Sequence, residues 1–81
     1  MVPKTFLVEC YAGYKADERP LRFRAREKDS RTFEVVEILD QWYGIGYRCF
    51  KLRADDGNIY ILRHLEKEDQ WVLDSFRRTR P

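Results

Sequence analysis

The chain has 81 residues, a length that allows one domain with a small hydrophobic core. Its 16 basic and 14 acidic side chains leave a net charge of +2, which is too balanced to indicate a polyanionic partner by itself. Two cysteines are too few for a disulfide-stapled secreted scaffold, and no apolar run is long enough for a signal peptide or a membrane span. We therefore expect a cytoplasmic protein without membrane association.

The N-terminal residues predict a strand followed by a loop. Residues 6–11 predict a strand, in which the two-residue alternation of side chains places Phe6, Val8 and Cys10 on one face. Residues 12–20 contain a glycine and a proline and show no periodicity, so they predict a loop.

Residues 21–26 show the clearest alternation in the chain and predict a strand with one buried face. The expected core positions are Leu21, Phe23 and Ala25. The opposite face carries an arginine comb, defined here as Arg22, Arg24 and Arg26. Residues 27–30 are polar and predict a hairpin loop.

Residues 31–43 are apolar on both faces and predict a long central strand that is paired on both edges and covered on both sides. Gly44 and Gly46 follow it and predict a hairpin turn, because a strand pattern comes next rather than the helix that a phosphate-binding loop needs. Trp42 and Trp71 are expected as core anchors, with an exposed peptide-binding stripe as the alternative. The positions that we expect to be buried are Phe23, Val36, Ile38, Phe50, Leu52, Ile61 and Trp71.

The C-terminal half predicts three further strands, over residues 47–53, 59–64 and 70–73. An Asp-Gly step at Asp56 predicts a hairpin between the first two, and a single helical turn is left open around residues 65–69. The fold expected is an all-β meander of five or six antiparallel strands, curled into a small, partly open barrel. One domain is expected, with its core over residues 5–76 and a tail over 77–81, and we expect a monomer.

Three runs of sequence carry a resemblance to a known family. They are the strand beginning Val35-Val-Glu-Ile-Leu-Asp-Gln-Trp, the turn Arg53-Ala-Asp-Asp-Gly, and the segment Gln70-Trp-Val-Leu. Over about residues 18–74 the chain resembles a small uncharacterised bacterial β-domain family, similar to a domain associated with inactive Y-family polymerase relatives in translesion DNA synthesis. The resemblance implies a stand-alone or fused β domain, and it assigns no activity and no functional residue.

Catalysis needs a positioned base, nucleophile or metal, and the sequence supplies little for any of them. His64 is the only histidine and stands at a strand end; Cys10 and Cys49 lie within strands, where cysteine behaves as a small apolar residue. Asp55 and Asp56 are explained by their turn. We expect no enzyme activity, no metal and no cofactor, and leave open that the two thiols are adjacent and redox-active or bind a metal with His64.

Two binding surfaces follow from the pattern. Residues 19–31 hold six bases against two acids, and small β-barrels use basic, aromatic faces to bind single-stranded nucleic acid. Pairing of the comb with Glu34 and Glu37 on the neighbouring strand would instead neutralise it. The candidate binding residues are Arg22, Arg24, Arg26, Tyr43, Tyr47, Lys51 and Arg53.

The function expected first is a non-enzymatic protein-interaction or adaptor module, whose sheet edges and aromatic turn accept an extended segment of an unknown protein partner. The alternative is a weak nucleic-acid-binding module that uses the comb, with DNA repair as the process that the resemblance suggests. Unpaired arginines beside exposed aromatic residues would favour the alternative, and neutralised arginines would favour the adaptor.

Overall fold

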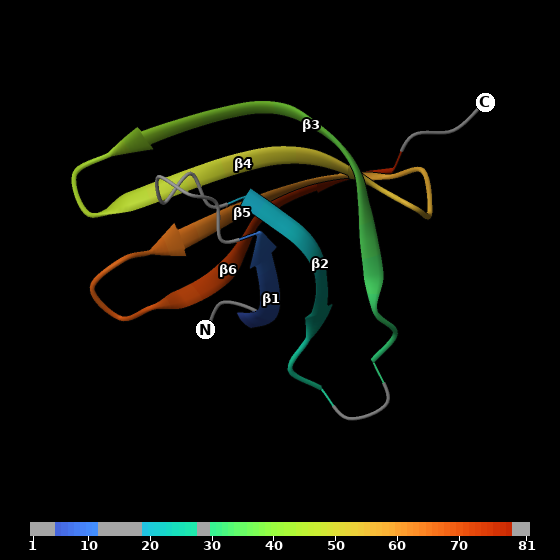
Figure 1. Cartoon of the computed structure of the whole chain (residues 1–81), viewed down its shortest axis with the longest axis horizontal. Coiled ribbons are helices and arrows are strands. Elements are labelled where there is room, and N and C mark those ends of the chain that lie inside the picture. The colour runs from blue at the N-terminus through green and yellow to red at the C-terminus, as the bar shows by residue number, and fades with distance from the viewer. Residues whose placement is uncertain (1–4, 12–18, 28–29, 79–81) are drawn as a thin grey trace.

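A computed structural model of the chain describes residues 5–11, 19–27 and 30–78. Six antiparallel strands follow one another in a meander, and the last pairs with the first to close a barrel (Figure 1). The strands are β1 (Thr5–Tyr11), β2 (Arg19–Ala25), β3 (Phe33–Gly44), β4 (Tyr47–Ala54), β5 (Ile59–Leu65) and β6 (Gln70–Arg77). The all-β barrel prediction is confirmed, with six strands and a closed ring. The described residues form no helix, so none that could cross a membrane is present among them.

Two short hydrogen-bonded ladders, here called seams, close the ring. β1 meets β6 only at the pairs formed by Thr5 and Phe6, and β2 meets β3 only at the pairs formed by Arg22 and Phe23, as far as the described residues go. The ladders that join β3, β4, β5 and β6 extend over most of each strand. The β1–β2 hairpin thus closes a larger four-stranded sheet, and much of β3 has a described neighbour on one side only.

Aromatic and aliphatic side chains fill the barrel, and those of β3 that pack against its core, Phe33, Val35 and Ile38, are only partly buried. The buried cluster consists of Phe6, Phe23, Ala25, Phe50, Leu52, Ala54, Tyr60, Leu62 and Trp71. The expected burial of Phe23, Phe50, Leu52 and Trp71 is confirmed, and Ile38 and Ile61 are only partly buried. The rings contact one another edge-on or tilted, and these geometries add to the stabilisation that burial provides.

A bulge in the β1–β2 ladder changes the expected face of one residue. The register shifts between Glu9 and Cys10, so Cys10 lies opposite Pro20 and the intervening Leu21 has no register partner. Pro20 is buried, whereas Leu21 is 38% exposed. The prediction that Leu21 faces the core is therefore wrong, because strict two-residue alternation fails at a bulge.

β3 departs furthest from expectation. Its ladder with β4 contains two bulges, between Val35 and Glu37 and between Ile38 and Asp40. Bulges bend a strand and increase its twist. Val36 is 62% exposed, so its predicted burial is wrong, and so is the prediction of a strand covered on both sides.

The turns confirm the hairpin predictions. Ile45 and Gly46 form a two-residue turn in which Gly46 has a φ of 84°, a conformation that costs glycine little. The Asp-Gly turn closes with a hydrogen bond from the Gly57 N–H to the Ala54 carbonyl at 2.9 Å. Residues 66–69, which connect β5 and β6, form a turn and no helix.

The last strand is longer than predicted. β6 continues to Arg77 instead of ending at residue 73, and the Phe76 ring contacts the Tyr60 ring at a centroid distance of 5.0 Å. Residues 12–18, in the predicted β1–β2 loop, and 79–81, in the predicted tail, lie outside the described residues.

Candidate protein-interaction edge

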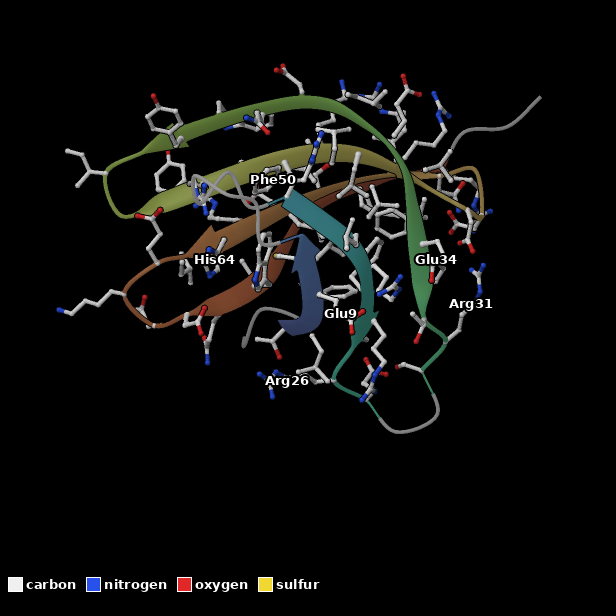
Figure 2. The ribbon with its side chains drawn as sticks, viewed as in Figure 1. Glu9, Arg26, Arg31, Glu34, Phe50 and His64 are labelled. Atoms are coloured by element: carbon white, nitrogen blue, oxygen red, sulfur yellow. The ribbon has the colours of Figure 1, made fainter. Side chains whose placement is uncertain are left out.

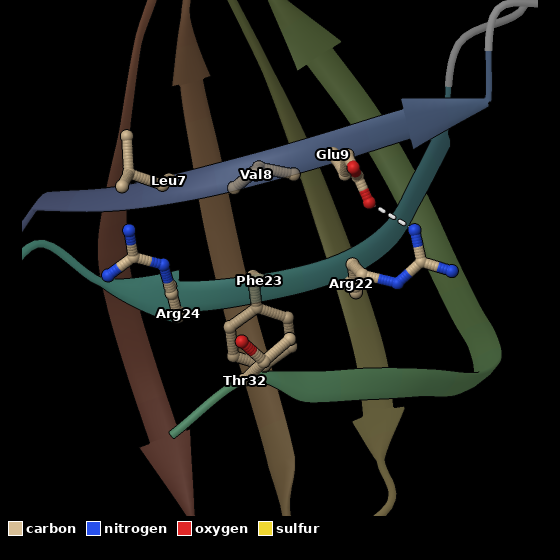
Figure 3. A pocket seen from close by; sticks show the side chains of 7 residues that line it. All are labelled: Leu7, Val8, Glu9, Arg22, Phe23, Arg24 and Thr32. Atoms are coloured by element: carbon tan, nitrogen blue, oxygen red, sulfur yellow. Dashed lines mark hydrogen bonds and ion pairs between the residues drawn. The ribbon is translucent and has the colours of Figure 1, made fainter. Parts of the chain in front are cut away.

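The arginine comb is partly neutralised. The Arg22 guanidinium donates to the Glu9 carboxylate on β1 (Figure 3). It also donates to the Glu34 carboxylate on β3 at 3.1 Å. The hydrogen bond to Glu9 and then the one to Glu34 raise the pKa of Arg22. The pairing with Glu34 follows the expectation for a neutralised comb, and Glu9 is a second partner that the expectation lacked.

Arg24 and Arg26 remain exposed and make no ion pair with a described residue. Arg26 lies at the end of the β1–β2 hairpin and points to solvent (Figure 2). Arg24 lies beside Leu7 at the rim of a shallow hollow of about 270 Å³ (Figure 3). The hollow is lined by Leu7, Val8, Glu9, Arg22, Phe23, Arg24 and Thr32.

The other predicted residues lie along the β3–β4 hairpin, with the two tyrosines beside its turn and the two bases farther along β4. Tyr43 comes nine residues after Glu34 on β3, which is about 30 Å of extended strand. The four residues are Tyr43, Tyr47, Lys51 and Arg53. The structure thus divides the predicted site into two sets, one on β2 and one on the β3–β4 hairpin.

Acidic residues lie opposite the basic pair of β4. Arg53 is paired in register with Glu37, with 3.9 Å between Arg53 Nε and Glu37 Oε1. Lys51 lies opposite Asp40, although no ion pair joins their side chains. Lys51 and Arg53 therefore lie opposite acids of β3, which makes them a poor surface for a polyanion.

The tip of the β3–β4 hairpin exposes large apolar groups. Tyr43 is 80% exposed, and Ile45, between two glycines in the turn, is fully exposed. Trp42 is 38% exposed, so the prediction that it anchors the core is wrong. Tyr47 is half-buried and lies across Gly44, with the Arg63 guanidinium 4.8 Å from its ring centroid. Trp42 and Tyr43 are consecutive in β3 and point to opposite faces of the strand, so both faces of the hairpin near its turn expose apolar surface.

The backbone of β3 beside these side chains has a free edge. A two-residue turn makes its flanking pair a hydrogen-bonded pair, and such pairs then alternate along the ladder. Gly44, Trp42 and Asp40 therefore bond to β4, whereas Gln41 and Tyr43 direct their N–H and C=O groups away from it. No described strand pairs with residues 36–44 on that side, and Figure 1 shows β3 as the outermost strand there. We call residues 40–44 the hairpin edge.

One side chain occupies part of this edge. The Asp40 Oδ1 accepts a hydrogen bond from the Gln41 N–H at 2.8 Å, which shows that this N–H does not bond to β4. The β3–β4 register is regular over the hairpin edge, whereas both bulges lie before it. The hairpin edge is consequently the stretch of β3 whose geometry suits an added strand.

A second hollow, of about 350 Å³, lies where β2 and β3 separate. It is lined by Arg19, Pro20, Leu21, Val35, Val36, Glu37 and Ile38. Leu21 and Val36 expose apolar surface there, so the apolar character of the free side of β3 continues beyond the hairpin edge.

The candidate catalytic residues have structural partners. His64 Nε2 lies 2.9 Å from Asp69 Oδ1, and the His64 ring stacks on Trp71 at a centroid distance of 4.4 Å. Cys10 and Cys49, both among the described residues, are not joined by a disulfide, and Cys49 is 1% exposed. Burial raises the pKa of the Cys49 thiol, and the adjacent Arg63 only partly offsets this.

The aspartates of the β4–β5 turn also have partners. Asp55 accepts a hydrogen bond from Arg31 at 2.8 Å, and Asp56 accepts one from the Tyr60 hydroxyl at 2.6 Å. Burial alone would raise the pKa of Asp56, but the bonds from Tyr60 and Asn58 outweigh it and hold the pKa below its ordinary value. Among the described residues, no group of histidine, cysteine and carboxylate side chains is arranged to hold a metal ion.

Comparison of the chain with protein-family models, curated proteins and solved structures finds no match. Any functional inference therefore depends on the geometry. Sequence reasoning missed the exposed Ile45, the edge backbone of Gln41 and the role of Asp40. One signal was available, because an apolar residue between two glycines at a hairpin turn has no core within reach.

Proposed function

We propose that the protein is a non-enzymatic protein-interaction module that binds an extended segment of a partner along the hairpin edge. The observation that carries the proposal is the free, regular backbone of residues 40–44 beside exposed aromatic and aliphatic side chains. An added strand would gain main-chain hydrogen bonds from Gln41 and Tyr43 and apolar contacts from the flanking side chains.

The strength of such binding can be bounded. Gln41 and Tyr43 together offer two N–H and two C=O groups, and each new bond contributes about 0.5–1.5 kcal/mol net. The exposed surface of Tyr43 and Ile45 adds a hydrophobic contribution on contact. The costs of association oppose these gains, so the proposal is for a weak or moderate interaction.

The alternative, single-stranded nucleic acid on the comb, has less support. Arg22 is bound by two carboxylates, and the exposed Arg24 and Arg26 stand apart from the exposed aromatic residues of the hairpin. A single strand bound by such a module would need bases to stack on aromatic rings near the phosphate contacts.

The test is site-specific photo-crosslinking in the source cell. A photoreactive phenylalanine analogue at Tyr43 is expected to give a protein adduct that survives nuclease treatment and disappears in the Gln41→Pro variant. The same analogue at Lys67, exposed in the β5–β6 turn, is the matched control and should not give that adduct. An adduct at Tyr43 that nuclease removes, or none that depends on the Gln41 backbone, would contradict the proposal.

A further inference from the structure

The acidic residues of β3 differ in whether they form an ion pair with a described basic residue. Glu34 is paired with Arg22, and Glu37 is paired with Arg53. Asp40 makes no ion pair with a described residue; its carboxylate bonds to the Gln41 N–H instead. Among the described acids of β3, Asp40 is therefore the one without an ion-pair partner, although Lys51 lies opposite it on β4.

Asp40 also holds a favourable position toward an added strand. The backbone N–H and C=O groups of Asp40 and Trp42 bond to β4 and point away from the free side. Each of these two residues would therefore form a non-hydrogen-bonded pair with the residue opposite it on an added strand. Side chains in such pairs approach more closely than in hydrogen-bonded pairs. The Asp40 and Trp42 side chains share one face of the strand, so both would contact the same side of the incoming segment.

The hydrogen bond from the Gln41 N–H to Asp40 couples charge to strand addition. An incoming strand must present a carbonyl to the Gln41 N–H and so displace the carboxylate of Asp40. A Lys or Arg opposite Asp40 would accept the displaced carboxylate, whereas an acidic residue there would repel it. The charge of the partner residue opposite Asp40 thus affects how readily the carboxylate leaves the Gln41 N–H.

We propose that the partner segment is an extended, antiparallel strand with a Lys or Arg opposite Asp40 and an apolar residue, two positions earlier, opposite Trp42. This inference rests on the proposed function and names the chemistry of its partner. The antiparallel direction follows from the greater stability of antiparallel pairing.

The probe is a synthetic peptide, acetyl-Thr-Thr-Val-Thr-Lys-Thr-amide, in which Val and Lys align with Trp42 and Asp40. A second peptide carries Glu in place of Lys. Titration of isotope-labelled protein is followed by the backbone amide signals of Gln41 and Tyr43. We expect the Lys peptide to bind roughly fivefold more tightly than the Glu peptide, from the difference between opposite and like charges across a strand pair.

Three variants separate the roles of charge and shape. In Asp40→Lys the preference should reverse, and in Asp40→Asn both peptides should bind alike because the charge is gone. Glu68→Lys, in the exposed β5–β6 turn, makes the same change in net charge away from the edge and should leave the preference unchanged.

The outcomes distinguish this inference from the function on which it rests. If both peptides shift the Gln41 and Tyr43 signals equally in the unaltered protein, the charge inference is overturned and edge binding stands. If the Lys preference persists in Asp40→Lys, the inference is also overturned. If neither peptide shifts these signals, both proposals fail.

Discussion

Proline substitutions at adjacent residues should have very different effects on stability. Proline lacks an N–H, so it is tolerated at an edge where that group faces solvent and disruptive where the group bonds to a neighbouring strand. The Gln41 N–H faces the free side, and the Trp42 N–H faces Cys49 on β4. The perturbation is therefore Gln41→Pro against Trp42→Pro, each referred to the alanine variant at the same position to remove the side-chain contribution.

The magnitudes follow from what each proline removes. Trp42→Pro leaves the carbonyl of Cys49, a residue that is 1% exposed, without its ladder donor, and such a loss costs about 1–3 kcal/mol before any strain. Gln41→Pro removes the exposed hydrogen bond from the Gln41 N–H to the Asp40 carboxylate. Its loss should lower the free energy of unfolding by about 1 kcal/mol at most. Proline at position 42 should therefore lower the free energy of unfolding by about 2 kcal/mol more than proline at position 41.

Urea unfolding measures both values, with the fluorescence of the buried Trp71 as a reporter that every variant retains. Failure of Trp42→Pro to fold would agree with the expected order, provided that Gln41→Pro folds. Equal destabilisation at the two positions, or a larger loss at Gln41, would refute the assignment of the free side.

The remaining predictions concern the thiols, the acid range and the comb. Under native conditions Cys49 should resist alkylation until the protein unfolds, because it is buried and its pKa is raised; rapid labelling would contradict this. Since the pKa of Asp56 is lowered in the folded state, its contribution to stability should be present above about pH 4 and vanish as the pH falls through the lowered value. The free energies of unfolding of Asp56→Asn and of the unaltered protein, measured in urea, should therefore converge in acid. A difference that does not change with pH would contradict this role of Asp56. Labelled single-stranded DNA at low salt should not bind through the comb at about 100 μM protein; binding lost on changing Arg22, Arg24 and Arg26 to Gln would favour the alternative function.

Sequence alone predicted the strands and turns well, since alternation and glycine-containing turns are local signals. Phe23, Phe50 and Leu52 are buried as expected because their strands keep a regular register where they face the core. The two-residue turn at Gly46 was likewise readable from its glycine.

Two of the three errors in burial share one physical cause. Leu21 and Val36 were placed in the core by strict alternation or by apolar character, and both lie next to bulges, which sequence periodicity does not reveal. Trp42 was placed inside because a small domain needs its aromatic residues, yet its strand extends past the short seam that joins β2 to β3. A free edge is a property of the whole topology, so the candidate site could not be located from local pattern.

Amide hydrogen exchange along β3 distinguishes a free hairpin edge from one that is already paired. In the free protein the Trp42 amide should be protected by β4, the Tyr43 amide should exchange rapidly, and the Gln41 amide should fall between them because Asp40 accepts its hydrogen bond. With the Lys peptide bound, Gln41 and Tyr43 should both become protected. A protected Tyr43 amide in the free protein, or no added protection on binding, would contradict the account.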